Sequence, residues 1–275
     1  MKYSSFDKYR REDTERSEAA LLTIWPKLAD FHEDLVLVGG LVPRYLCRQD
    51  LAEGDWQPRT LDVDLAISLA ADGGMYEGLS MRLRSEGFEY EDRRFTKHVD
   101  SVDLHMDLLT ERPSEQAPRS AAVSDLTVSA FLGVDRALKV FRICSLAGRN
   151  LSGARVRATV KVCEIGPFLC LKLQAYAQRV ERKDAFDFLR TLLDYDGGPQ
   201  QAAAAFRAEE GVNLAFPTAR RALEEHFADE QSDGPVAYAA FCLGDRALVG
   251  GGETEEPRAQ LTAEAVTAAF LLLGK

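Results

Sequence analysis

The sequence lacks any apolar run close to the roughly 20 residues that a helix needs to cross a bilayer. Its first sixteen residues are polar and charged, unlike the apolar core of a secretory signal. These absences favour a cytoplasmic protein that has no membrane partner.

Cysteine and histidine are too few and too scattered for a disulfide framework or a zinc centre. The five cysteines are odd in number and include no C-x-x-C pair, which is typical of reduced thiols in the cytoplasm. The four histidines lie far apart, and none stands in the H-E-x-x-H spacing of zinc proteases. We therefore do not expect a zinc enzyme.

An excess of basic charge is also missing, because the formal net charge is −10. The charge is unevenly distributed, however. Residues 136–190 contain twelve lysines and arginines against four acids, which gives about +8 there and about −18 over the rest of the chain. A locally basic surface can bind a polyanion even in an acidic protein, with an affinity that falls as salt rises. The alternative is an ordinary solvated face.

The most informative stretch is an apolar run that ends in two glycines and precedes a pair of carboxylates. Residues 36–38 lead to Gly39 and Gly40, and Asp62 and Asp64 stand two residues apart in a later apolar strand. Because strand side chains alternate, both acids share one face. Paired carboxylates repel one another unless a cation lies between them, and Mg²⁺ prefers carboxylate oxygens. The glycines permit a tight turn whose backbone N–H groups can approach a phosphate.

A third carboxylate can come from residues 102–109, where apolar and polar residues alternate. Asp103, His105 and Asp107 occupy the polar face of this predicted strand. From the pattern alone Asp107 and Asp103 are both candidates, and the family resemblance described next favours Asp107, because residues 106–110 are most similar to that family's hydrophobic-Asp-hydrophobic strand. The simpler interpretation is that these acids are only the solvated faces of two amphipathic strands.

The order of these motifs resembles the nucleotidyltransferase superfamily typified by DNA polymerase β, and the resemblance is carried by Gly39-Gly40, Asp62, Asp64 and Asp107. It implies a mixed sheet with flanking helices, in which the three carboxylates hold two Mg²⁺ ions and the glycine turn cradles the phosphates of an NTP. It also implies metal-dependent transfer of a nucleoside monophosphate to an acceptor hydroxyl, with Asp107 as a candidate general base. Arg44 could reach the same phosphates or serve as a solubilising surface residue.

Hydrophobic periodicity predicts an α+β protein in two domains. We expect a catalytic nucleotidyltransferase domain over residues 1–165 and a helical domain over residues 166–275 that contributes nucleotide-site residues. The first sixteen residues are expected to be poorly ordered at first, and residues 50–59 to form a lid, a substrate entrance or a surface insertion. The expected helices of the first domain are 15–31 with a kink at Pro26, 41–49 and 75–86. Its expected strands are 35–38, 61–67, 88–97, 101–109, 138–145 and 154–165, with 88–97 and 101–109 paired as a hairpin and a turn at residues 150–153 before the last strand. The expected helices of the second are 167–181, 184–195, 198–209, 217–229, 234–246 and 262–273.

A second group of charged residues lies at the start of the helical part. In an unbroken helix Lys172, Arg179 and Lys183 would fall on nearly one stripe, with Asp187 one turn after Lys183. Three cations on one stripe are unfavourable unless anions meet them, and Asp187 offsets only part of their charge. Taken alone, the pattern is that of a surface helix with an ordinary ion pair.

The spacing K-x-x-A-x-x-x-R-x-x-x-K-D-x-x-D over residues 172–187 resembles the signature of AbiEii/AbiGii-type nucleotidyltransferases, the toxins of one class of bacterial toxin–antitoxin pairs. The resemblance covers about residues 35–195. It implies that Lys172, Lys183 and Asp184 belong to the nucleotide site, with Lys172 and Asp184 also catalytic, and that Arg179 and Asp187 support them. Arg59-Thr60 before Asp62 is similar to the family's R-x-T-x-D-x-D variant, with no residue between Arg and Thr, which adds Thr60 to the candidate nucleotide site.

Together these motifs predict an enzyme that moves an NMP from an NTP to an acceptor hydroxyl. The toxin resemblance implies an RNA end as acceptor, such as the acceptor stem of tRNA, and a cognate antitoxin as partner. Two alternatives stay open. One is transfer to a small molecule or to a protein hydroxyl, and the other is a member of the family that binds a partner without catalysis.

Overall fold

The computed structural model describes residues 3–48, 60–68, 78–244 and 252–275, with only the backbone of residues 252 and 253. The chain divides into two compact units, which we describe separately. Unit 1 comprises Met1–Arg10, Leu46–Pro58 and Ile165–Lys275, and unit 2 comprises Arg11–Tyr45 and Arg59–Glu164. The predicted α+β class, with a mixed sheet and helices, is confirmed. Within the described ranges, no helix is long and apolar enough to cross a membrane.

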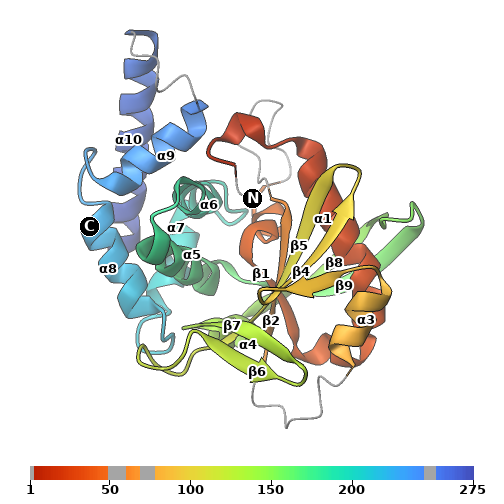
Figure 1. Ribbon diagram of the computed structural model, residues 1–275. Helices are drawn as coiled ribbons and strands as arrows, with labels where there is room; N and C mark the ends of the chain where they lie inside the picture. Colours follow the sequence, from red (N-terminus) through yellow and green to blue (C-terminus); the bar gives the residue numbers. More distant parts are fainter. Residues whose placement is uncertain (1–2, 49–59, 69–77, 245–251) are drawn as a thin grey trace. The chain divides into compact units, whose positions relative to one another are not determined.

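A mixed sheet forms the centre of unit 2 (Figure 1). Its strand order is β3-β4-β5-β2-β1-β9-β8, and β7 pairs with both β5 and β6. Strands β2 and β5, β1 and β9, and β5 and β7 are parallel, and the other neighbours are antiparallel. The strands are β1 (Leu35–Val38), β2 (Asp62–Ile67), β3 (Glu89–Glu91), β4 (Arg94–Val99), β5 (Val102–Glu111), β6 (Ser120–Val123), β7 (Leu126–Phe131), β8 (Phe141–Arg149) and β9 (Arg155–Cys163).

The predicted hairpin before residue 110 is present, but its first arm is not one strand. Strands β4 and β5 pair across Asp100 and Ser101, which both have positive φ (53° and 84°), as a tight two-residue hairpin turn requires. Asp92 and Arg93 also have positive φ (48° and 67°). The expected strand 88–97 is therefore wrong, because this second turn divides it into β3 and β4.

The helices of unit 2 differ from the prediction mainly at the amino-terminal side. They are α1 (Arg11–Ile24), the 3-10 segments η2 (Trp25–Asp34) and η3 (Gly39–Leu41), and the short helices α2 (Pro43–Leu46), α3 (Leu79–Ser85) and α4 (Val134–Lys139). The expected helix 15–31 begins earlier, at Arg11, and the kink expected at Pro26 lies where α1 gives way to the 3-10 segment η2. The expected helix 41–49 shrinks to α2. The beginning of the expected helix 75–86 lies outside the described residues, as does the expected loop 50–59.

The polar start of the chain is ordered because its polar side chains are buried and bonded. Asp13, Thr14 and Ser17 of α1 are all buried. The Ser17 hydroxyl donates to the carbonyl of Thr60 at 3.1 Å, and the Thr60 N–H donates to Thr14 Oγ1 at 3.1 Å. The expectation of disorder in the first sixteen residues is therefore wrong for residues 11–16. The 3-10 segment η1 (Phe6–Lys8) precedes them, in unit 1.

Three further elements of unit 2 were not predicted from the sequence. Strands β6 and β7 and helix α4 fill residues 120–139, for which no element was predicted apart from the start of strand 138–145. That strand begins later, at Phe141, because residues 138 and 139 end α4. The following hairpin, β8–β9, turns at residues 150–154 as expected.

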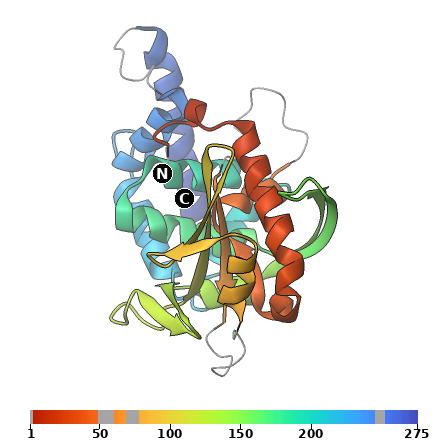
Figure 2. The ribbon, with the colours of Figure 1, turned by 45° about the vertical axis from the view of Figure 1, so that its right-hand side comes forward.

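Unit 1 is mainly helical (Figure 2), and aromatic side chains fill part of its core. Its helices are α5 (Ile165–Arg179), α6 (Arg182–Leu193), α7 (Pro199–Arg207), α8 (Phe216–His226), α9 (Asp233–Leu243) and α10 (Gly252–Leu273). Phe186 on α6 and Phe241 on α9 are buried, with ring centroids 4.8 Å apart. Helix α5 packs on α6, α7 and α8, and α9 packs on α6 and α10. Six helices were predicted here, and α10 begins ten residues before the expected start at 262.

The five cysteines should differ sharply in reactivity. Burial raises the pKa of the Cys47 and Cys242 thiols to about 12, whereas Cys144 on β8 is only half-buried. Because the thiolate is the reacting form, we expect iodoacetamide at pH 8 to alkylate Cys144 first and Cys47 and Cys242 only after denaturation. Peptide mass mapping of the native and urea-treated protein measures this. Comparable early modification of Cys242 would contradict the packing of α9.

Candidate active site

The three predicted carboxylates lie on two neighbouring parallel strands of unit 2. In the register of β2 and β5, Asp64 pairs with Asp107 and Asp62 pairs with His105. Paired residues of adjacent strands project from the same side of a sheet, and residues two apart share that side. Asp62, Asp64 and Asp107 therefore occupy one face of the sheet, while Val63 is buried on the other.

The glycine turn contacts the middle carboxylate. Strand β1 ends at Val38, which is the register partner of Asp64 on β2. Gly39 has a φ of 73°, and a Cβ atom built on it would lie 1.8 Å from Asp64 Oδ2. The N–H of Gly40 points at the same oxygen, with an N···O distance of 3.4 Å. The turn therefore requires a residue without a side chain at position 39, both for its backbone conformation and for the approach of Asp64.

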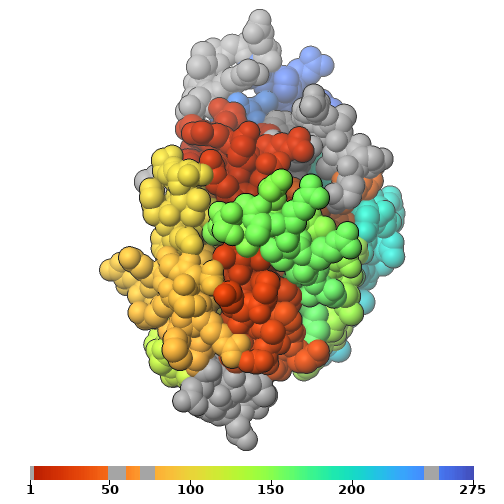
Figure 3. All heavy atoms as spheres, turned by 90° about the vertical axis from the view of Figure 1, so that its right-hand side faces the viewer, coloured from red at the N-terminus to blue at the C-terminus, as the bar shows by residue number. Residues whose placement is uncertain are grey.

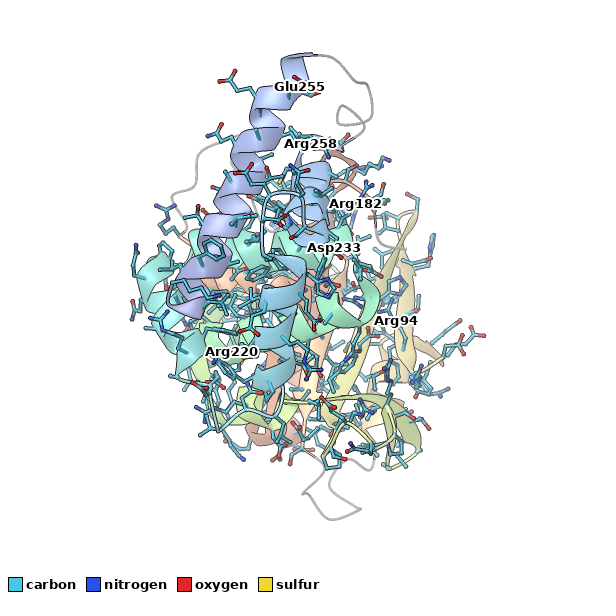
Figure 4. All side chains as sticks on the ribbon, turned by 90° about the vertical axis from the view of Figure 1, so that its left-hand side faces the viewer. Arg94, Arg182, Arg220, Asp233, Glu255 and Arg258 are labelled. Carbon is cyan, nitrogen blue, oxygen red and sulfur yellow. The ribbon has the colours of Figure 1, made fainter. Side chains whose placement is uncertain are left out.

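An arginine that the sequence analysis did not single out neutralises this acidic face. Arg94 on β4 is the register partner of Asp107 and is labelled in Figure 4. Its Nε donates to Asp107 Oδ1 at 2.7 Å and its Nη2 donates to Asp107 Oδ2, while Nη1 lies 3.9 Å from Asp62 Oδ1. Burial by itself lowers the pKa of Arg94, but the hydrogen bonds and charge of Asp107, with the charges of Asp62 and Asp64, raise it overall. The guanidinium is thus a fixed counter-ion to the carboxylates.

The alternative third carboxylate, Asp103, lies elsewhere on β5. Its side chain is 58% exposed and accepts a hydrogen bond from His98 Nδ1 at 2.8 Å, which lowers its pKa. Between Asp103 and Asp107, His105 contacts the Thr96 hydroxyl through Nδ1 at 3.1 Å. Burial, and next the charge of Arg94, lower the pKa of His105, so this imidazole is neutral at pH 7. Asp107, and not Asp103, is the carboxylate that the register places beside Asp64.

Two other predicted nucleotide-site residues have internal partners. Thr60 is buried, and its hydroxyl accepts the N–H of Asp62 at 3.1 Å, so it fixes the start of β2. Arg44 donates from Nη2 to Glu18 Oε2 at 2.8 Å, and Tyr45 donates to the other oxygen of Glu18. Arg59 lies outside the described residues. Thr60 thus acts on the carboxylate strand through the backbone, and Arg44 contacts α1.

The second group of predicted residues belongs to unit 1, where the two expected helices 167–181 and 184–195 are present as α5 and α6, so the single stripe considered for Lys172, Arg179 and Lys183 in an unbroken helix is wrong. Helix α5 ends at Arg179 and α6 begins at Arg182. Between them Val180 has a φ of 51°, a left-handed conformation that no α-helix continues. Lys172 and Lys183 therefore stand on two different helices rather than on one stripe.

The same break creates a buried ionic cluster. Asp187 accepts hydrogen bonds from Lys172 Nζ at 2.7 Å and from Lys183 Nζ at 2.7 and 2.9 Å. Arg179 donates through Nε and Nη2 to Asp184 at 2.5 and 2.7 Å. Asp184 and Asp187 are buried, and the side chains of Lys172 and Lys183 are only 12% and 6% exposed. Lys183 is buried, and Lys172 is partly buried; both are paired with aspartates rather than forming a solvated stripe.

The carboxylates of unit 2 have the right chemistry for a divalent hard cation, although they are not gathered as a finished site. Asp62, Asp64 and Asp107 supply oxygen donors on one face, which is the donor set that Mg²⁺ prefers. Among the described residues, no group of three or more His, Cys, Asp or Glu side chains is close enough to hold a metal ion. Asp107 is engaged by Arg94, so a cation at this face competes with the guanidinium for it.

Comparison with known proteins adds no relative to this description. No protein-family model and no curated protein matches the chain. A functional assignment therefore depends on the arrangement of the residues themselves.

Proposed function

We propose that the chain is a metal-dependent nucleotidyltransferase with a DNA polymerase β-like catalytic domain, similar to the AbiEii/AbiGii-type toxins. The observation that carries this proposal is the contact of Asp64 with the Gly39-Gly40 turn, with Asp62 and Asp107 on the same face. A strand ending in a glycine turn, two acids on the next strand and a third on its neighbour are the parts that this chemistry needs. The simpler alternative, two solvated strand faces, does not account for a carboxylate packed against a glycine in a left-handed conformation.

In the proposed reaction, the acceptor hydroxyl attacks the α-phosphorus of an NTP, the bond to the bridging oxygen breaks, and pyrophosphate leaves. Asp62, Asp64 and Asp107 would hold Mg²⁺, which when bound offsets the triphosphate charge and stabilises the leaving pyrophosphate. Asp107 would accept the proton of the attacking hydroxyl, which requires that it exchange its contact with Arg94. Arg94 would then lie beside the reacting phosphates with its positive charge.

The ionic cluster of unit 1 enters the proposal as a second source of positive charge. Lys172, Arg179 and Lys183, with Asp184, are the candidate nucleotide-binding residues. Their charge is offset by Asp184 and Asp187 in the structure. A triphosphate could therefore be bound only by exchange of an aspartate for a phosphate oxygen. The acceptor in this proposal is an RNA end, such as a tRNA acceptor stem, and the regulatory partner is a cognate antitoxin.

Incubation with Mg²⁺ and each of four α-³²P-labelled NTPs, with and without total RNA, tests the proposal. We expect label in RNA from the wild-type protein and only background label from Asp64→Asn and Asp107→Asn. Asp103→Asn is the matched control, since Asp103 also lies on β5 but pairs with His98 at an exposed position. It should retain full transfer.

Three results other than the expected one would each change the assignment. Label on protein or on a small molecule keeps the chemistry and replaces the RNA acceptor. Absence of label in every fraction, together with no shift of the melting temperature by any NTP and Mg²⁺, contradicts the proposal and favours a binding protein without catalysis. Equal loss of transfer in Asp103→Asn would show that the register does not define the site.

A further inference from the structure

The β8–β9 hairpin presents a solvent-exposed face at one edge of the sheet in unit 2. Strand β8 is the last strand of the sheet order and pairs only with β9 among the described strands. Leu146, Val160 and Val162 are buried on one side of the hairpin, and helix α1 packs against both strands. The other side is exposed along both strands, from Ile143 to Arg149 and from Arg155 to Thr159 in alternation. Figure 3 shows the hairpin, in green, at the surface beside α1.

Three arginines on this exposed side have no carboxylate partner within the described residues. Lys161 is bound to Glu33 Oε2 at 2.8 Å, and Arg142, on the opposite side, is bound to Glu164. Arg149, Arg155 and Arg157 make no such ion pair with any described residue, and Arg149 donates only to the carbonyl of Gly153, at 2.7 Å. We call these three residues the arginine face. They carry part of the charge of the basic segment 136–190 that is left without an ion pair among the described residues.

The arginine face places like charges in direct opposition. Arg149 and Arg155 are register partners on the two antiparallel strands, and Arg157 follows two residues along β9 on the same side. Like charges directly opposite one another destabilise a strand pair, whereas opposite charges stabilise it. A chain with a net charge of −10 contains many acids that could have stood at one of these positions. The arrangement suits an anionic partner that meets all three guanidinium groups together.

We infer that the arginine face binds the phosphodiester backbone of RNA. Guanidinium groups match phosphate oxygens with two parallel hydrogen bonds, and the alternate residues of β9 present them about 7 Å apart. Of the other exposed residues on this side, Ser145, Ala147 and Thr159 are small, Ile143 is a large apolar residue that is 67% exposed, and none is aromatic. An acidic protein partner would need aromatic anchors for a stable interface. The choice of RNA rather than DNA rests on the proposed function.

The test is anisotropy of a fluorescein-labelled single-stranded RNA of about 30 nucleotides, titrated with the full chain. In Arg149→Ala/Arg155→Ala/Arg157→Ala, loss of three phosphate contacts should reduce the salt slope of log K by about 2 and weaken binding about 100-fold at 0.1 M salt. The matched control is Arg220→Ala/Arg221→Ala/Arg258→Ala, which has the same change in net charge on exposed residues of α8 and α10 (Figure 4). It should bind RNA like the wild-type protein.

A single charge reversal separates binding from folding. Arg155→Glu replaces the like-charge pair with Arg149 by an attractive pair, so the melting temperature should stay the same or rise while RNA affinity falls at least tenfold. A variant that fails to fold would show the opposite change in melting temperature.

Several outcomes overturn the inference. They are absence of RNA binding by the wild-type protein, an equal loss in the control triple variant, and tighter binding of a DNA strand of the same length. Loss of polyglutamate binding in the arginine variants with RNA binding unchanged would identify an acidic protein as the partner instead.

The inference and the proposed function fail separately. Asp64→Asn should bind RNA like the wild-type protein, because Asp64 lies outside the arginine face. RNA binding that depends on the three arginines, without any nucleotidyl transfer, would sustain the inference and remove the proposed function. Transfer that persists in the triple arginine variant with unchanged RNA affinity would do the reverse.

Discussion

Replacement of Asp187 by Ala is expected to lower the free energy of unfolding by about 3–5 kcal/mol, because it leaves the buried Lys183 ammonium without its anion and leaves Lys172 only Asp184, whose Oδ1 lies 3.8 Å away. Lys172 and Lys183 both donate to Asp187 at 2.7 Å, and all three side chains are at most 12% exposed. Since whole domains are stable by only about 5–15 kcal/mol, the change should be large in urea denaturation of the full chain. The free energy of unfolding of Asp187→Asn should lie between those of the wild-type protein and Asp187→Ala, because an amide oxygen can accept one hydrogen bond but carries no charge.

A matched control separates burial from pairing. Lys183–Asp187 and Arg220–Glu224 are both ion pairs four residues apart on a helix, but the second has side chains that are 49% and 45% exposed. Glu224→Ala should therefore change stability by less than about 0.5 kcal/mol. Combining Asp187→Leu with Lys172→Met and Lys183→Met should restore most of the stability, as replacement of whole buried ionic clusters often does. A cost of Asp187→Ala no larger than that of Glu224→Ala would mean that the lysines can reach water.

The break between α5 and α6 shows why this cluster was predicted only in part. The sequence predicts two helices here, 167–181 and 184–195, but no glycine or proline fixes where the first one ends, and the break lies two residues earlier than expected. Val180 adopts a φ of 51°, although this conformation is energetically less favourable for a β-branched residue than for most other residues. What compensates is the antiparallel packing of α5 on α6, which closes the ion pairs of Asp184 and Asp187. Such a long-range gain leaves no trace in local periodicity.

The face that carries Asp62, Asp64 and Asp107 shows the opposite case. Local rules were sufficient to predict the partner of Asp107, but they were applied only to the carboxylates. Alternation in residues 61–67 and 101–109 correctly predicts that Asp62 and Asp64 share a face, and the β4–β5 hairpin follows from adjacent strand patterns. Once the turn is fixed at Asp100 and Ser101, counting back along the hairpin pairs Arg94 with Asp107. The counter-ion was therefore available from the sequence. The expected strands 88–97 and 101–109 did not place the turn at Asp100 and Ser101, so the register that pairs Arg94 with Asp107 was not predicted.

The buried polar side chains of α1 could not be predicted by any local rule. Asp13, Thr14 and Ser17 stand in a stretch whose polarity is typical of a solvated segment. Their partners, at Arg16 and Thr60, include one that is more than 40 residues away. Only the fold shows that polar atoms in this helix position the first residues of the carboxylate strand.

Replacement of Gly39 by Ala should destabilise the protein by about 2–5 kcal/mol. About 1–2 kcal/mol comes from a side chain at a φ of 73°, and about 1–3 kcal/mol from overpacking against Asp64, whose Oδ2, Cγ and Cβ would lie 1.8, 2.5 and 2.7 Å from the new Cβ. Rotation of the Asp64 side chain can relieve the first two contacts but not the third. Urea denaturation of the metal-free protein measures the change.

Gly153→Ala provides the matched control, because Gly153 has a φ of 82° and no atom within 4 Å of its added Cβ. It should lose only the conformational part, about 1–2 kcal/mol. In the cycle that combines Gly39→Ala with Asp64→Gly, the two changes should couple by about 1–3 kcal/mol, since Asp64→Gly removes the side-chain atoms that the new Cβ at position 39 would contact. If Gly39→Ala costs no more than Gly153→Ala and shows no coupling to position 64, the glycine turn and the carboxylate do not touch. The observation on which the proposed nucleotidyl transfer rests would then be lost, whatever the assay with labelled NTPs returned.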